Sequence, residues 1–462
     1  MNKRINAESD KLSYRTVHRF RKLITALFCS LIVVYFVSVE SVAGTIVSLD
    51  SLLSEHINTA LNNNPALTAA SIMIDAAREG VTQAATWKDP SLKFSLMNMP
   101  VSSFDFNQEA MTGVSVGVAQ MIPWKGKTGL KTDISGIMVG IKAAQLFSKE
   151  LDLAESLSHI WFDLAFLTEN LNILSHHIML IDNLTVIALS RYETGSGLQQ
   201  DILRAETMRS KHEDMRIELE QNISTLKHRF ASLMGGEIRF NLTTPSHLSI
   251  AFSDIESNKL TDLMFEHNPE WNIAQLRIES AQQKMKLAEL AAMPDFNFGA
   301  GYTIRQDSDA GMRRYDLVSL SVGATLPVHK EKKQNAAVRE MAAGKRSAML
   351  QKRSLALELN FRLQKLFDED QRLGEQIMLY TVGVVPQAEA TLAAATSAYS
   401  VGKADFQAPL SADLMLHDIQ LERLVRIRER LKTRASLSAL TGGMDLIGTL
   451  EPSVDNNGGY GK

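Results

Sequence analysis

Four short segments alternate between apolar residues and small or polar ones, within the stretches 91–121 and 295–326. Successive side chains of a strand point to opposite faces, so this period of two predicts four β-strands in two hairpins. In one segment the apolar set is Phe296, Phe298, Ala300, Tyr302 and Ile304. Strands of about 9–11 residues with one apolar face and one small, polar face are typical of a membrane β-barrel. A soluble sandwich is the alternative, although four strands between long helices make a poor sandwich.

A helical period follows each hairpin. From about Lys127 to Arg191 nothing interrupts it, which corresponds to a helix of roughly 95 Å. A 3-4-3-4 spacing, typical of a coiled-coil seam, joins Leu157, Ile160, Leu164, Leu167, Leu171, Leu174, Ile178 and Ile181. A second apolar line lies on another face, so the helix is expected to contact two neighbours. In the second half a similar line is interrupted by Asp370.

The two halves of the chain resemble each other. Asn64-Pro65 recurs as Asn268-Pro269 at an offset of 204, and Tyr192 and Gly195 recur as Tyr399 and Gly402 at an offset of 207. An internal tandem repeat of this length predicts two equivalent units in one elongated body. We expect a signal peptide at 1–43, a first repeat at 44–235, a linker at 236–260, a second repeat at 261–443 and a flexible tail at 444–462.

The predicted sheet cannot close by itself. Four strands are too few for a barrel, and an open sheet edge in lipid leaves unpaired backbone groups that cost several kcal/mol each. Copies of the chain must therefore share one sheet. Two copies would leave little free lumen, whereas three would supply twelve strands, enough for a conduit. The sequence thus predicts an α+β membrane protein, a trimeric 12-stranded β-barrel continued by a long α-helical barrel.

Composition narrows the location and excludes several classes of function. A basic stretch precedes an apolar run from Leu23 to Val39, and small residues precede Gly44, which is the pattern of a cleaved secretory signal. An uncleaved membrane anchor is the alternative. The single cysteine, Cys29, lies inside this segment, and the net charge of −3 implies no nucleic-acid partner. The helices are therefore expected in the periplasm.

The chain resembles the TolC-type outer-membrane efflux proteins over nearly all of residues 46–443. The resemblance rests on the Asn-Asn-Pro opening at 63–65, the barrel-to-helix junction at 120–127, the corner at 191–195 and the ending at 233–235. The segment 98–112 is similar to the heavy-metal branch, the CzcC- and CusC-like components. Two features depart from the family: no N-terminal cysteine is available for a lipid, and Ala408 and Ser411 replace gate carboxylates.

The resemblance implies an outer-membrane exit duct of a tripartite efflux system, not an enzyme. The expected partners are two further copies in a homotrimer, outer-membrane lipid, a periplasmic membrane-fusion adaptor and an inner-membrane pump of the resistance-nodulation-division (RND) class. Heavy-metal cations are the expected substrates. Drug efflux or type I protein secretion is the alternative within the fold. A non-conducting coiled-coil scaffold that spans the periplasm is the alternative from another class.

The resemblance also suggests residues at the periplasmic end. Asp201 matches a gate carboxylate of the family, and its expected partner is Lys403. Asp405 and Asp413 are further candidates for a ring that attracts cations. The corner residues expected to contact the adaptor are Tyr192, Gly195, Tyr399 and Gly402. Turn chemistry and a solvated helix start are the structural alternatives for these positions.

No cofactor site is expected. The sequence lacks a metalloprotease His-Glu-x-x-His motif and a glycine-rich phosphate loop. Met97 and Met99 lie on the polar-face parity of their strand, and thioethers suit Cu(I) or Ag(I), so they are weak candidates for a metal contact. Methionines more often serve in packing. His176 and His177 are adjacent on a helix and point apart, so they cannot share one metal ion.

Overall fold

The computed structural model describes residues 51–236 and 257–443. The predicted signal peptide, most of the predicted linker and the predicted tail lie outside these residues. The first half contains α2 (Ser51–Asn63), α3 (Pro65–Ala85), β1 (Ser91–Met97), β2 (Gly113–Ile122), α4 (Lys127–Glu193) and α5 (Gln199–Leu233). The second half contains α6 (Ser257–His267), α7 (Pro269–Leu290), β3 (Phe296–Ile304), β4 (Leu317–Ala324), α8 (Gln334–Leu379), η1 (Tyr380–Val384), α9 (Val385–Ser400) and α10 (Gln407–Leu440).

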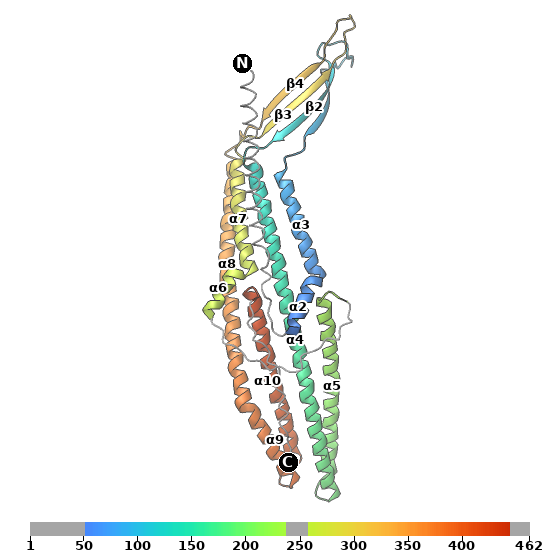
Figure 1. Ribbon diagram of the computed structural model, residues 1–462, viewed down its shortest axis with the longest axis vertical. Helices are drawn as coiled ribbons and strands as arrows, with labels where there is room; N and C mark the ends of the chain where they lie inside the picture. Colours follow the sequence, from blue (N-terminus) through green and yellow to red (C-terminus); the bar gives the residue numbers. More distant parts are fainter. Residues whose placement is uncertain (1–50, 237–256, 444–462) are drawn as a thin grey trace, which may run out of the picture.

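The molecule is elongated. A bundle of long helices forms its body, the sheet leans away from one end of the bundle, and the turns after α4 and α9 lie at the other end (Figure 1). The four predicted strands are present and form one antiparallel sheet in the order β1-β2-β3-β4. The sheet therefore joins the hairpins of both halves through β2 and β3.

Helix α4 and the continuous segment Gln334–Ser400 are each 67 residues long. At 1.5 Å per residue each spans roughly 100 Å. Five members of the predicted α4 seam are buried, namely Leu157, Leu164, Leu174, Ile178 and Ile181. Around Leu157 and Trp161, side chains from α2, α3, α5 and α10 form the largest apolar cluster of the described chain. Its core thus lies midway along the bundle, where the short helices pack against the long ones.

The two Asn-Pro motifs make corresponding contacts. The Asn64 side chain accepts a hydrogen bond from the backbone N–H of Ala66 and donates one to the carbonyl of Leu233, at 2.8 Å each. Asn268 accepts from the N–H of Trp271 at 3.1 Å and donates to the carbonyl of Leu440 at 2.9 Å. Each asparagine therefore caps the start of one helix and the end of another.

A glycine permits each of these close contacts. Gly235 and Gly442 have φ values of +77° and +87°, in the left-handed region. A Cβ on Gly235 would lie 2.4 Å from the backbone oxygen of Asn63, and one on Gly442 would lie 3.0 Å from that of His267. A larger residue at either position would force the helix end away from the cap.

Three features differ from the expectations. Helices α2 and α6 were not predicted, and α6 begins at Ser257, inside the stretch assigned to the linker. Leu53, Ile57 and Ala60 of α2 follow the i, i+4, i+7 spacing that could have revealed it, and all three are buried. The second long helix is also not regular, because η1 is a π-turn.

Candidate functional site

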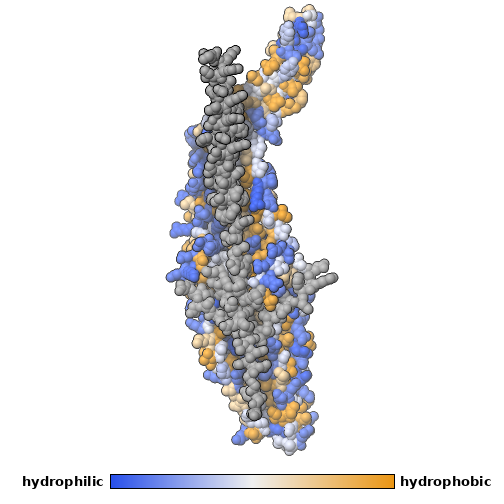
Figure 2. All heavy atoms as spheres, in the orientation of Figure 1, coloured by the Kyte–Doolittle hydropathy of each residue, from blue (hydrophilic) through white to orange (hydrophobic). Residues whose placement is uncertain are grey.

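The strand register places the apolar residues of all four strands on one face. Phe94 pairs with Val116, Val116 with Tyr302, and Tyr302 with Val318, so one row crosses the whole sheet. In a single chain this face is open to solvent: 69% of Phe94 and 74% of Val318 is exposed. Apolar residues gather over the sheet, below polar loops at its far end (Figure 2). Exposed apolar area of this extent marks a surface that a membrane or another protein covers.

The opposite face of the sheet carries small and polar side chains. One of its rows contains Lys93, Gly117, Gly301 and Ser319. Met97 lies on this face beside Gly113, and its sulfur is 4.0 Å from the Thr303 hydroxyl. Met99 follows the end of β1. Among residues 51–236 and 257–443, no group of three or more His, Cys, Asp or Glu side chains is arranged to hold a metal ion.

Both edges of the sheet are open. Strands β1 and β4 are the outer members, and each pairs with only one neighbour in this chain. The apolar Leu92 and Leu96 lie on β1, and Leu320 and Val322 lie on β4. An edge strand with apolar side chains and free backbone groups is prone to pair with another strand.

The turns at the opposite end of the molecule have the predicted form. Gly195 and Gly402 adopt φ values of +74° and +73°, which close the turns after α4 and α9. Tyr192 is 47% exposed beside the first turn, as an adaptor contact would require. The prediction for Tyr399 needs correction, because only 1% of this residue is exposed. Tyr399 instead packs edge-on against Phe406 and belongs to the apolar cluster at the tip.

Arg191 joins the two turns, and the sequence analysis gave it no role. Its guanidinium stacks over the Tyr399 ring at 4.6 Å and donates hydrogen bonds to the carbonyls of Tyr399 and Ser196. The sequence did contain a signal that Arg191 has a structural role: it lies in the last turn of α4, where a cation interacts favourably with the helix dipole. The contact fixes the α4–α5 hairpin against the α9–α10 hairpin.

The predicted gate residues lie at this end but do not meet within one chain. Asp201 is buried and accepts a hydrogen bond from the Tyr399 hydroxyl at 3.5 Å. Burial, followed by the negative charge of Asp201, raises the pKa of Tyr399 above its ordinary value, so the phenol stays protonated. Lys403 is exposed in the turn after Gly402. Asp405 is exposed and accepts from the backbone N–H of Ala408 at 3.2 Å, at the start of α10.

Asp413 belongs to the interior rather than to a ring at the tip or the surface. Its side chain is fully buried, and its carboxylate accepts a hydrogen bond from Nδ1 of His177 at 2.6 Å. The sequence prediction treated Asp413 as a charge near an exposed helix start. The register of α10 against α4, which no local pattern gives, turns it inward instead.

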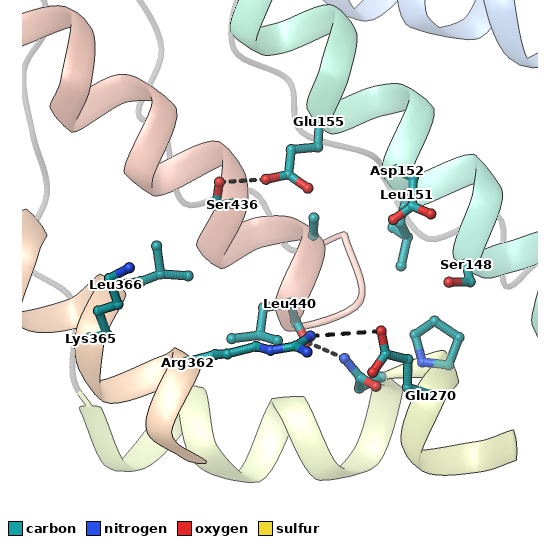
Figure 3. Close-up of a pocket in the computed structure, with 13 residues that line it drawn as sticks. Ser148, Leu151, Asp152, Glu155, Glu270, Arg362, Lys365, Leu366, Ser436 and Leu440 are labelled. Atoms are coloured by element: carbon teal, nitrogen blue, oxygen red, sulfur yellow. Dashed lines mark hydrogen bonds and ion pairs between the residues drawn. The ribbon is translucent and has the colours of Figure 1, made fainter. Parts of the chain in front are cut away.

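The described part of the chain also has a pocket of about 270 Å³, lined by charged side chains, midway along the body where α4, α7, α8 and α10 meet. Asp152 and Glu155 approach from α4, and Glu270 from α7 forms an ion pair with Arg362 of α8 (Figure 3). Burial, together with Glu155 and Glu270, raises the pKa of Asp152. The Ser436 hydroxyl of α10 donates a hydrogen bond to Glu155 in this pocket (Figure 3). The pocket is open to solvent and lined by charged side chains, unlike most cofactor pockets.

Comparison with known proteins identifies the family. The profile of the outer membrane efflux protein family matches residues 56–236 and 260–443, which together are most of the chain. No curated protein gives a significant sequence match.

Solved structures share the fold at low sequence identity. The outer-membrane channel OprN is 16% identical with a TM-score of 0.72, and the match covers 87% of this chain and 93% of that one. The outer membrane protein VceC from Vibrio cholerae is 18% identical with a TM-score of 0.71, over 85% and 97% of the two chains. CusC is 14% identical with a TM-score of 0.71, over 88% and 96%.

Proposed function

The chain belongs to the outer membrane efflux protein family, and we propose that three copies form an exit duct in the outer membrane of a Gram-negative bacterium. The single observation that carries this proposal is the open four-stranded sheet, with one apolar face and two unpaired edges. Pairing β4 of one copy with β1 of the next removes all edges, and three copies give a barrel of twelve strands. The apolar face then contacts lipid.

The helices support the same assembly. The most apolar stretch of 18 residues in α4 is only 33% buried within one chain, and that of the helix Gln334–Ser400 only 11%. Helix α5 packs against α4, and its other flank is largely free of neighbours in the described chain. Adjacent copies would cover these surfaces and close a helical tube about 100 Å long below the barrel. We infer that the two halves are copies of one ancestral unit.

The assembly needs partners to transport anything. It has no nucleotide site and no cofactor in this proposal, so energy comes from an inner-membrane pump of the RND class through a periplasmic adaptor. The exposed Tyr192, Gly195, Val401 and Gly402 form the surface that the adaptor would contact. Lys403 and Asp405 are exposed at this end, and in the proposed trimer they would meet charged groups of neighbouring copies and restrict the opening. Asp201 is buried in its own chain and would contribute to the gate only through its hydrogen bond with Tyr399.

The proposed substrates are heavy-metal cations, on the basis of the segment 98–112. The substrate class can be tested separately from the duct. A strain that lacks the gene should become sensitive to metal salts and keep its tolerance of dyes and detergents. The reverse pattern would assign the protein to drug efflux.

Cysteine cross-linking tests the closed barrel. Strands β1 and β4 are three strand spacings apart in one chain, roughly 14 Å, which exceeds the reach of a disulfide. In a Cys29→Ser background, Lys93→Cys combined with Ser321→Cys should therefore cross-link only between chains. We expect dimers and trimers after oxidation, and nothing larger.

The matched control places both cysteines within one chain. Lys93 and Gly117 are register partners on β1 and β2, so Lys93→Cys with Gly117→Cys should give a monomer with an internal disulfide. The purified wild-type trimer should also conduct ions in planar bilayers when its tip is opened. A monomer that leaves membranes without detergent, forms no cross-links and never conducts would contradict the duct and favour the scaffold.

A further inference from the structure

Three histidines from three different helices meet in the interior between the tip and the centre of the body. His177 of α4, His212 of α5 and His417 of α10 are all buried. The ring centroids of His177 and His417 lie 5.0 Å apart in a T-shaped arrangement, and those of His212 and His417 lie 5.7 Å apart in a stack. Counted along the helices, the cluster lies roughly 25 Å from the turns at Gly195 and Gly402.

The cluster has one firm hydrogen bond and several unsatisfied atoms. His177 donates from Nδ1 to Asp413, and its Nε2 lies 3.1 Å from the amide oxygen of Gln420. No hydrogen-bond partner contacts Nδ1 of His212, Nε2 of His417 or the second carboxylate oxygen of Asp413. Buried polar atoms without partners cost stability and are expected where a group has another role.

His212 occupies a special place on its helix. Throughout Gln199–Leu233, the buried residues are Asp201, Ala205, His212, Phe230 and Ala231. Between Ala205 and Phe230 the His212 ring is therefore the only buried side chain of α5. The other contacts of this stretch are more exposed: Met208 packs, partly buried, against the apolar cluster at the tip, and Arg209 forms an exposed ion pair with Asp182 of α4. His212 is therefore the one buried anchor of this stretch of α5.

We propose that His177, His212, His417 and Asp413 form an acid-sensitive clasp, which ties α5 to α4 and α10 at neutral pH and releases it when His212 and His417 are protonated. The one buried carboxylate of the cluster, Asp413, already pairs with His177 and cannot also neutralise two imidazolium ions at His212 and His417, so acidification places uncompensated positive charge in the interior. Separation of α5 from α10 admits water and relieves this charge. The free ring nitrogens do not converge on a metal-ligand geometry among the described residues, which favours the proton as the ligand.

The charged groups around the cluster determine whether acid strengthens or weakens the clasp. Burial lowers the pKa of both His212 and His417 below the ordinary 6.5. Their neighbours oppose each other: Asp413 raises the pKa of both rings and Asp418 that of His417, whereas the other histidines lower them. Helix α9, packed on another side of α10, brings the apolar Ala388 and Leu392, and its one charged residue, Glu389, is exposed.

The consequence is a clasp that weakens on the acid side. Above pH 6.5 the two rings are neutral in both the closed and the released state, so pH has no effect. Below pH 6.5 the released state binds protons that the closed state resists. The equilibrium constant for release should rise by up to about tenfold per pH unit for each of the two histidines, until the pH reaches their lowered pKa.

Hydrogen exchange of the full-length assembly in detergent measures this release directly. Amide protection factors, which remove the chemical pH dependence of exchange, should fall at least about tenfold between pH 7.5 and 5.5 in peptides around His212. Peptides from α7, which contains no histidine, should not change. Adding Zn²⁺ at pH 7.5 should leave α5 unchanged.

Variants on the same helix provide the control. His212→Phe keeps a stacked ring without a charge and should reduce the pH dependence of α5 to the contribution of His417; His417→Gln should likewise leave only that of His212, and the double variant should abolish the dependence. His228→Phe alters an exposed histidine of α5 and should leave that dependence intact. The clasp is wrong if wild-type α5 shows equal protection at both pH values, if His228→Phe has the effect of His212→Phe, or if Zn²⁺ rather than acid changes α5.

The link between the clasp and conduction rests on the proposed duct. Wild-type conductance in planar bilayers should be higher at pH 5.5 than at 7.5, His212→Phe should reduce the difference, and the double variant His212→Phe with His417→Gln should remove it. Protein that never conducts at either pH would contradict the duct alone, since exchange in α5 still reports on the clasp. Conductance that is independent of pH while α5 opens in acid would show that the clasp does not control the passage.

Discussion

The two long helices, α4 and Gln334–Ser400, have the same length, but different contacts hold them to the rest of the helical bundle. Aligned by their starts, corresponding residues are 207 apart, and Asp163 of α4 corresponds to Asp370 of α8. Both aspartates contact basic residues of α10. Asp163 lies 2.6 Å from Nζ of Lys432, with 26% of its side chain exposed. Asp370 is only 7% exposed and lies between Arg430 and Arg434, at 3.0 and 2.7 Å from their Nε atoms.

The same alignment reveals a second contrast. Residues 173–177 of α4 are regular helix and end at His177, whereas the corresponding Tyr380–Val384 form the π-turn. Pro386 explains the turn, because its ring lacks an N–H and would collide with the carbonyl of Val382 in a regular helix. In the turn, the N–H of Val385 bonds to the carbonyl of Tyr380.

These two contrasts show that similar sequences in the two halves pack in different environments. Helix α10 packs against α4, α8 and α9, so it presents basic residues on two faces. Helix α5 packs mainly against α4. Because both aspartates pair with α10, the contrast is one of depth: Asp370 is enclosed with Arg434, whereas Asp163 and Lys432 stay partly exposed. In the proposed trimer, the free flank of α5 would meet the next copy.

Breaking the buried ion pair should give the largest effect. Asp370→Asn removes the buried carboxylate that Arg430 and Arg434 share, which should lower the free energy of unfolding by about 3–5 kcal/mol. Asp163→Asn removes a partly exposed partner and should cost less than about 1 kcal/mol. Denaturant titration of the purified variants measures both. Equal losses would show that burial does not distinguish the two halves.

The ion pair also predicts how the second half responds to acid. Burial alone would raise the pKa of Asp370, but hydrogen bonds from Arg434 and Arg430 outweigh it and hold the pKa below the ordinary 3.8. The stabilisation is therefore present above pH 3.8 and is lost as the pH falls through the lower pKa of the folded state. Wild type and Asp370→Asn should differ at neutral pH and converge in strong acid. A constant difference down to the acid limit would contradict this assignment.

The helix caps at Asn64 and Asn268 are the contacts that should contribute most equally to the stability of the two halves. Asn64→Ala and Asn268→Ala each remove a helix cap and a hydrogen bond to the end of another helix, and each should cost about 1–2 kcal/mol. Thermal unfolding of the two variants under one set of conditions compares them. A loss at only one site would show that the corresponding contacts are not equivalent. Asn62→Ala, at an exposed position of α2, is the matched control and should have little effect.

The π-turn should be the least sensitive to the loss of a side-chain contact. The Tyr380 hydroxyl donates to Glu422 near the surface, and Arg426 stacks on the Tyr380 ring at 4.1 Å. Tyr380→Phe keeps the ring and should cost roughly 0.5–1 kcal/mol. If Pro386 is the cause of the turn, the helix register beyond it stays unchanged. A pair of cysteines introduced across the two turns at the tip should then form the same disulfide with and without Tyr380→Phe. A shifted cross-linking pattern would make Tyr380 the cause instead.

The local patterns predicted most of the elements. The period of two gave the four strands, and the first long helix begins at Lys127 as expected. The glycines at 195 and 402 gave the corners, because a left-handed turn favours that residue type. The same reasoning failed where a residue's environment depends on a distant helix. Asp413 was expected near the surface and is buried, and Tyr399 was expected in a partner contact and packs inside.

The order and type of most elements, the alternation that gives the sheet an apolar face and the outer-membrane efflux family could be predicted from the sequence alone, because periodicity and turn chemistry act over a few residues. Which charges are paired and which histidines are enclosed was decided by the tertiary structure. Those outcomes depend on the axial register of α10 against α4 and α8, and that register is set by packing along the whole length of the helices. A residue's own neighbours in the sequence carry no information about it.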